Sequence, residues 1–195
     1  MVEKFPKGTI KPVYRRGKNL KEILSPSIFP QRQNNCITEI RFCNNCDLCK
    51  NYIIKENKFK CTVTGQIFNV KGNITCNSSY VIYLITCTKC LEQYVGSSDD
   101  FKPRCRGHKS DIMLKKEKCG VVKHFNSKCI PPTNDLCKYF TIQLIEALPP
   151  DNCTDEHLWK REKYWQAKLF TMTHGMNSLN DWYCKKRKGH RNTST

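Results

Sequence analysis

The stretch YVIYLITCTKCLEQYVGSS (80–98) carries the signal that decides the fold. Its first part, YVIYLITC (80–87), has β-branched and aromatic residues on both alternating faces, as expected of a strand that is covered on both sides. A second strand, EQYVGSS (92–98), follows after a short turn. We therefore predict a β-hairpin whose tip lies near residues 88–91.

Four further elements are expected after the hairpin. Two helices come first, one over FKPRCRGHKSDIMLKK (101–116), which begins at about residue 103, and one over VVKHFNS (121–127). A third strand, YFTIQLIEAL (139–148), alternates and is closed by two prolines. The last helix, TDEHLWKREKYWQAKLF (154–170), has a threonine N-cap and acidic residues in its first turn. This order of elements predicts a small α+β domain.

Composition narrows the class of protein. The 195 residues include 34 Lys and Arg against 17 Asp and Glu, which gives a formal net charge of +17. Such a charge favours a polyanionic partner, most simply nucleic acid, over a membrane surface. We find no run of about 18 apolar residues and no apolar segment near the start, so we expect neither a membrane span nor a secretory signal.

Both ends of the chain are basic. Residues 1–35 are predicted to form a proline-punctuated linker or arm, in which basic residues clearly outnumber acidic ones. Residues 183–195 contain five basic residues and no acidic one after Cys184, and we expect a disordered tail. Such a tail could contact phosphate or serve as a nuclear import signal.

The last predicted helix contains a carboxylate in an apolar stripe. Leu158, Glu162, Trp165 and Leu169 follow one another at steps of four, three and four, so they share one face. Burying a lone carboxylate is costly, and Glu162 should therefore meet a cation, a metal ion or strong hydrogen-bond donors. The ordinary alternative is that Glu162 pairs with a structural arginine or lies at the edge of the stripe.

Other polar residues have an ordinary interpretation when each is taken alone. Arg104 and His108 are four residues apart and share a helix face, where two basic side chains are commonly solvated. Tyr83 and Tyr94 lie on neighbouring strands, in which tyrosine is frequent. Asn180 lies in a turn-like segment, MNSLND (176–181), where asparagine often makes the turn.

Taken in order, these motifs resemble the GIY-YIG endonuclease family. VIY (81–83) corresponds to the GIY motif and YVG (94–96) to the YIG motif. They are followed by the residues Arg104, His108, Glu162 and Asn180. The wider segments RCRGHKSDI, VVKHFN, REKYWQAKL and SLND look like the GIY-YIG domain of Penelope-like retroelements, and the upstream RRGKNLKEIL resembles the connector after their reverse transcriptase. The resemblance implies a nuclease domain over residues 79–182, with a small three-stranded antiparallel sheet flanked by helices.

The resemblance also implies an activity, a metal-dependent DNA endonuclease that works in the nucleus, with element RNA or the reverse transcriptase as further partners. Glu162 would hold Mg²⁺ or Mn²⁺ at the scissile phosphate. Tyr83 or Tyr94 would help to deprotonate or position the attacking water, and Arg104 would stabilise charge on the phosphoryl oxygens. His108 would assist proton transfer or contact phosphate, and Asn180 would order the site.

The 14 cysteines are better explained by metal thiolates than by disulfides, because no export signal is evident. Cys87 and Cys90 form a CxxC pair that suits half of a tetrahedral zinc site. The family resemblance adds two histidines as candidates, of which we prefer His124, because His108 can hardly combine an active-site role with zinc binding. A second zinc site is predicted in the Cys-rich segment 36–78, with the ligands Cys43, Cys46 and Cys49 and either Cys61 or Cys76.

Two alternatives to the endonuclease come from other classes. One is a catalytically inactive, zinc-containing module that binds nucleic acid and keeps the fold. The other, weaker alternative is a disulfide-rich exported protein, which the Asn-x-Ser/Thr sequons at Asn73, Asn77 and Asn152 would suit.

Overall fold

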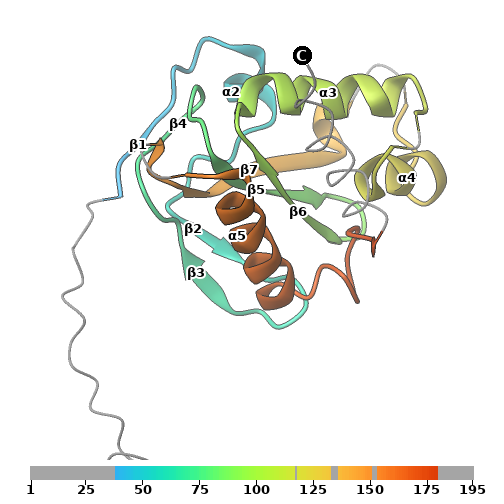
Figure 1. Cartoon of the computed structure of the whole chain (residues 1–195). Coiled ribbons are helices and arrows are strands. Elements are labelled where there is room, and N and C mark those ends of the chain that lie inside the picture. Colours follow the sequence, from blue (N-terminus) through green and yellow to red (C-terminus); the bar gives the residue numbers. More distant parts are fainter. Residues whose placement is uncertain (1–37, 117, 133–135, 151–152, 180–195) are drawn as a thin grey trace, which may run out of the picture. The chain divides into compact units, whose positions relative to one another are not determined.

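The structure is a computed structural model that describes residues 38–116, 118–132, 136–150 and 153–179 (Figure 1). The predicted basic arm (1–35), the basic tail (183–195) and the candidate Asn180 lie outside the described residues. Within the described part of the chain, none of the helices combines the length and the apolar character that a membrane crossing requires.

A three-stranded antiparallel sheet forms the centre of the fold. Its strands are β5 (Val81–Cys87), β6 (Gln93–Ser98) and β7 (Phe140–Ala147), in the order β6-β5-β7. This confirms the predicted hairpin and the third strand. Tyr83 pairs with Gly96, and Ile82 pairs with Ser97, so Tyr83 and Ser97 project from opposite faces of the sheet.

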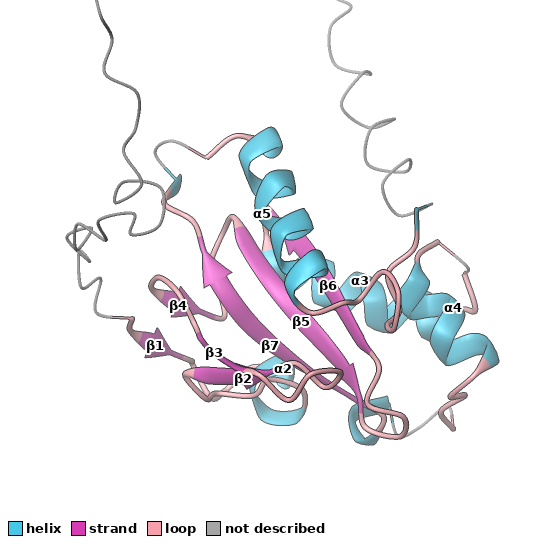
Figure 2. Ribbon diagram, turned by 90° about the horizontal axis from the view of Figure 1, so that it is seen from below, coloured by secondary structure: helices cyan, strands magenta, loops and turns pink. Residues whose placement is uncertain are grey.

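Helices cover both faces of the sheet. α3 (Phe101–Met113) begins two residues earlier than predicted, with its proline in the first turn, where the missing N–H costs no hydrogen bond. α4 (Gly120–Ser127) follows, and η1 (Leu136–Lys138) precedes β7. α5 (Asp155–Lys168) begins after Thr154, whose Oγ1 accepts a hydrogen bond from the His157 amide at 3.2 Å, which confirms the predicted N-cap. α5 packs on β5 and β6 (Figures 1 and 2).

The Cys-rich segment packs beside β7 (Figure 2). It contains a parallel pair, β1 (Ile40–Arg41) with β4 (Ile74–Thr75), an antiparallel pair, β2 (Lys58–Lys60) with β3 (Ile67–Asn69), and the short helix α2 (Asp47–Asn51). The Ile54 amide donates to the Ile142 carbonyl at 2.9 Å, and the Lys71 amide donates to the Ile145 carbonyl at 3.0 Å. The segment therefore satisfies backbone groups at the open edge of β7.

One hydrophobic core joins this segment to the sheet. Phe59 and Phe68 of the Cys-rich segment lie against Trp165 of α5, with ring centroids 5.2 and 5.6 Å from the indole. The described residues of the predicted segments 36–78 and 79–182 accordingly belong to one compact unit. The apolar stripe on α5 thus packs against residues that precede it by about one hundred positions.

Candidate active site and metal centres

The phenol of Tyr83 lies across Gly96 on the neighbouring strand. A Cβ atom at residue 96 would lie 2.5 Å from both Cζ and the hydroxyl oxygen of Tyr83, which is closer than side-chain atoms approach one another. Only glycine leaves enough room here for the Tyr83 ring, which lies over the backbone of the edge strand β6.

A chain of hydrogen bonds begins at this hydroxyl group. The Nε–H of Arg104 donates to the Tyr83 oxygen at 3.1 Å, and Nε2 of His108 lies 2.8 Å from the same oxygen. Both partners come from α3, where their spacing of four residues places them on one face, as predicted. Tyr83 and His108 are 0% and 1% exposed, whereas Arg104 is partly exposed, so the guanidinium is the member of the chain that lies nearest to solvent.

Electrostatics keeps Tyr83 and Arg104 in defined charge states. Burial raises the pKa of Tyr83 above its usual range, and the neighbouring Arg104 opposes this only in part. The pKa of Arg104 is raised as well, chiefly by its interaction with Tyr83. At neutral pH the site therefore holds a neutral phenol against a guanidinium cation.

Tyr94 completes this face of the site. It pairs with Ile85, two positions from Gly96 on β6, and so projects from the same face of the sheet as Tyr83. Its ring lies edge-on to the His108 imidazole, with the ring centroids 5.8 Å apart. The structure thus brings together four of the predicted residues, namely Tyr83, Tyr94, Arg104 and His108.

Glu162 approaches from the other face of the sheet. It is 2% exposed and accepts hydrogen bonds from the Ser97 hydroxyl and, at 3.1 Å, from Nε2 of Gln166. The prediction that this carboxylate meets strong donors is confirmed, whereas the structural arginine of α5, Arg161, pairs with Glu146 at 2.8 Å. The charge of Glu162 also contributes to the raised pKa of Tyr83, so the two sides of β6 are electrostatically coupled.

A residue that the sequence reasoning missed is Asn177. Its side chain accepts a hydrogen bond from the Val95 amide and donates one to the Val95 carbonyl, both at 2.9 Å. It thereby satisfies backbone groups on the outer edge of β6, between the positions of Tyr94 and Gly96. The signal was present in the segment MNSLND, which contains Asn177 as well as the predicted Asn180.

The first candidate metal centre lies at the hairpin tip. Cys87, Cys90, His124 and Cys129 offer four donor atoms, all within 4.8 Å of one another. Sγ of Cys90 is 3.6 Å from Nε2 of His124, and tetrahedral zinc bonds would place sulfur and nitrogen about 3.6 Å apart. Nδ1 of His124 lies 3.2 Å from a carboxylate oxygen of Glu92, the usual outer partner of a metal-bound imidazole.

The centre contains the three predicted ligands, Cys87, Cys90 and His124, and a fourth that was not predicted. The missed ligand is Cys129, which follows His124 at a spacing, H-x₄-C, that could have indicated it. His108, the other histidine that the family resemblance had suggested, contacts Tyr83 instead and is not a member of the set.

The second candidate metal centre lies in the Cys-rich segment. Cys43, Cys46 and Cys49 are joined by Cys76, and Sγ of Cys43 is 3.7 Å from Sγ of Cys49. Backbone amides of Cys46 and Asn45 lower the pKa of the Cys43 thiol to about 6, as suits a metal thiolate. Of the two predicted fourth ligands, Cys61 lies elsewhere, with its sulfur 3.7 Å from the Leu169 carbonyl.

This second centre adjoins the helix that carries Arg104 and His108. Asp47, between two of the cysteines, forms an ion pair with Lys109 of α3 at 2.9 Å, and the Lys109 ammonium lies 5.0 Å from the centre of the Tyr52 ring. Both donor sets could hold a metal ion such as zinc.

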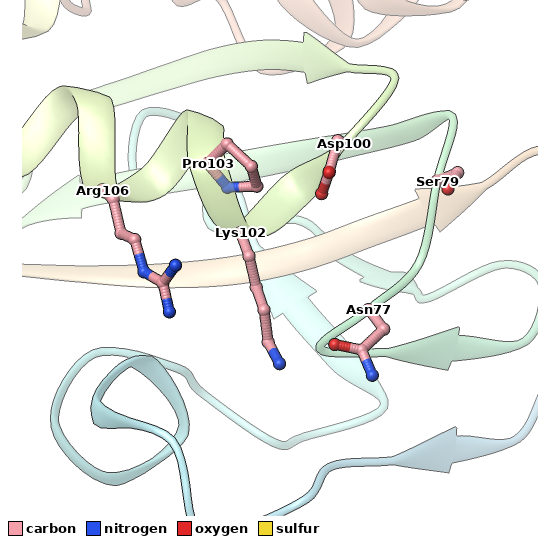
Figure 3. Close-up of a pocket in the computed structure, with 6 residues that line it drawn as sticks. All are labelled: Asn77, Ser79, Asp100, Lys102, Pro103 and Arg106. Atoms are coloured by element: carbon pink, nitrogen blue, oxygen red, sulfur yellow. The ribbon is translucent and has the colours of Figure 1, made fainter.

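A basic pocket lies on the outer side of α3 (Figure 3). Its volume is about 330 Å³, and it is lined by six residues, which are Asn77, Ser79, Asp100, Lys102, Pro103 and Arg106. Lys102 and Arg106 are each two positions from Arg104, so they point away from the Tyr83 cluster. These cations could contact phosphate, but the pocket contains none of the predicted catalytic residues.

Comparisons with known proteins found similarity in solved structures alone. One is a variant of the catalytic domain of the intron endonuclease I-TevI, with 25% identity and a TM-score of 0.40, covering 49% of this chain and 89% of that one. The other is the catalytic domain of the homing endonuclease I-TevI, with 24% identity and a TM-score of 0.40, covering 50% of this chain and 95% of that one. No family model and no curated protein matches the chain.

A substitution at Gly96 tests the geometry of this site. Gly96→Ala should lower the rate of the DNA cleavage that the sequence predicts by about 10²-fold, because the new methyl group must displace the Tyr83 hydroxyl from Arg104 and His108. The control is Gly107→Ala on α3, where a Cβ meets nothing within 4 Å, so that activity should persist and helix stability should rise slightly. Full activity of Gly96→Ala would show that the position of Tyr83 is irrelevant to function.

Proposed function

We propose that the chain is a metal-dependent DNA endonuclease of the GIY-YIG type, which hydrolyses phosphodiester bonds. The observation that carries this proposal is the hydrogen-bonded chain Arg104–Tyr83–His108, with the buried carboxylate Glu162 electrostatically coupled to it across β6. A cation, a neutral phenol and an imidazole on one side of β6, with a carboxylate on its other side, are groups that can serve phosphoryl transfer to water.

A divalent cation suits Glu162. The carboxylate and the adjoining Ser97 hydroxyl are hard oxygen donors, which Mg²⁺ and Mn²⁺ prefer. When bound, such an ion supplies charge stabilisation for the phosphoryl group and the leaving oxygen.

The chain's own residues perform the remaining steps. Tyr83 takes a proton from the attacking water as it passes its own proton to Nε2 of His108, so that no phenolate forms, in keeping with the raised pKa of Tyr83. Arg104 remains a cation and stabilises charge on the phosphoryl oxygens. Tyr94 packs against the imidazole and limits its rotation. Asn177 holds the edge strand on which Tyr94 and Gly96 lie.

We further propose that the two cysteine-rich sets hold zinc, and that the protein acts in the nucleus as part of, or as a descendant of, a Penelope-like retroelement. The sequence motifs between residues 13 and 182 support this origin, and the charge of +17 suits DNA and element RNA as partners. The element's reverse transcriptase is the expected protein partner. Asn180 remains a predicted site residue.

The test of the proposed function is nicking of supercoiled plasmid. Purified full chain should convert supercoiled to open-circular DNA with Mg²⁺ or Mn²⁺, and EDTA added in excess of the divalent ion should stop the reaction. Wild type and Glu162→Ala should differ strongly in this assay. Equal conversion by the two proteins, or none by either, would refute the proposal.

One observation favours the alternative of an inactive nucleic-acid-binding module. Both oxygens of Glu162 already accept hydrogen bonds from protein donors, one from Ser97 and one from Gln166. A carboxylate held in this way can be purely structural. The alternative predicts DNA binding without cleavage, and the plasmid assay separates the two.

DNA binding should depend strongly on salt. Lys and Arg contacts to phosphate release counterions, so we expect affinity to fall well over tenfold between low and physiological salt. Fluorescence anisotropy with a labelled duplex measures this directly, without divalent ions so that no cleavage occurs. An affinity that stays constant with salt would contradict binding through phosphate.

A further inference from the structure

The residue immediately before α4 is Cys119, whose side chain does not cap the helix. Cys119 has the extended backbone of an N-cap, a position at which Ser, Thr, Asp and Asn are preferred because their oxygens accept from the first amides. No side-chain capping bond is made by Cys119. Its sulfur instead lies 3.8 Å from Nδ1 of His108, the ring nitrogen that faces away from Tyr83.

The hydrogen bonds at Tyr83 are compatible with one particular position of the proton on His108. Nε–H of Arg104 donates to the Tyr83 oxygen, which leaves the phenolic O–H able to act as a donor. The O–H of the neutral phenol can donate to Nε2 of His108, 2.8 Å away, and in that arrangement Nε2 carries no proton. A neutral imidazole holds its single proton on the other nitrogen, Nδ1, which faces the sulfur of Cys119.

We propose that Cys119 is a positioning residue, whose sulfur accepts the Nδ1–H of His108 and so fixes the tautomer and the rotation of the ring. This inference rests on the proposed function, because it gives His108 an unprotonated Nε2 with which to accept the Tyr83 proton. The group at one ring nitrogen sets which nitrogen is protonated, and sulfur is a weak acceptor able to do so.

A hydrogen bond from Nδ1–H explains the approach of the Cys119 sulfur to His108 better than metal binding or packing does. Among the residues that the structure describes, both stand outside the two four-donor sets, so no metal set found there brings them together. Packing between α3 and α4 needs only an apolar group of this size, which valine would provide. Valine offers no acceptor, and it therefore separates packing from hydrogen bonding.

The test measures the tautomer itself, without DNA. Long-range ¹H–¹⁵N correlation spectra of the ¹⁵N-labelled full chain distinguish the two neutral tautomers, and the His108 signals are those lost in His108→Gln. In wild type we expect the proton on Nδ1. In Cys119→Val we expect a mixture of tautomers, and in the control Cys153→Val, whose thiol lies outside both metal sets, we expect the wild-type spectrum.

A wild-type spectrum with the proton on Nε2 would overturn the proposal, even if Cys119→Val failed to fold. An unchanged tautomer in a folded Cys119→Val protein would also overturn it. In the plasmid assay, Cys119→Val should cleave about 10-fold to 100-fold more slowly at unchanged DNA affinity. Since the spectra need no substrate, failure of this inference and failure of the proposed endonuclease are distinguishable.

Discussion

Replacing Glu162 with glutamine should lower metal-dependent cleavage by about 10³-fold. The amide keeps the shape of the side chain and one oxygen that can accept from Ser97 or Gln166, but it loses the charge that would hold a divalent ion. The fold should therefore persist, and binding of DNA without divalent ions should change little. A loss of this size requires that the carboxylate acts in the reaction itself.

The matched control is Glu156→Gln on the same helix. Glu156 is exposed in the first turn of α5 and pairs with Lys160, so its loss removes the same charge at a distance from Tyr83. Nicking rates at several Mg²⁺ concentrations, with melting temperatures of all three proteins, complete the experiment. Comparable rates in Glu162→Gln and wild type would leave the carboxylate a structural role and favour the binding module.

Removing one thiolate from the hairpin-tip centre should have the largest effect on stability. Cys129→Ser should reduce bound zinc from two ions to one ion per chain and lower the melting temperature by roughly 10 °C or more. The reason is that the four ligands come from the hairpin tip, from α4 and from the residue two positions after α4. A metal ion there joins the hairpin tip to α4, and its loss leaves that connection to hydrophobic packing alone.

Cys153→Ser provides the control, because this partly buried cysteine belongs to neither donor set. Zinc content is measured by atomic absorption, and free thiols are counted with and without a chelator. Wild-type zinc content in Cys129→Ser would remove Cys129 from the ligand set. Protein that contains no metal and fully oxidised cysteines would instead support the disulfide-rich alternative.

Local patterns were sufficient for much of the fold and of the site. Alternation in β5 and β6 predicted the hairpin, and the steps of four and three on α5 placed Glu162 among buried residues, as found. The spacing of Arg104 and His108 placed them on one helix face, which the structure turns toward Tyr83. These features depend on periods of two and 3.6 residues, which a sequence displays directly.

Other features depend on contacts between distant parts of the chain. Cys129 and Cys76 complete the two donor sets. Sequence spacing alone could not distinguish Cys61 from Cys76 as the fourth ligand of the second set, and the structure places Cys61 elsewhere. Asn177 and Cys119 acquire roles through partners 82 and 11 residues away. No periodicity indicates such partners.

The sequence by itself determined the main elements from residue 80 onward, the chemistry of the candidate residues and their order, because hydrophobic period and residue type are local properties. Tertiary structure alone decided that the Tyr83 ring crosses Gly96, that Glu162 lies on the opposite face of β6, and that the Cys-rich segment shares the core of the sheet. The physical reason is that strand register and side-chain packing are set by long-range contacts, which decide the face from which each functional group approaches.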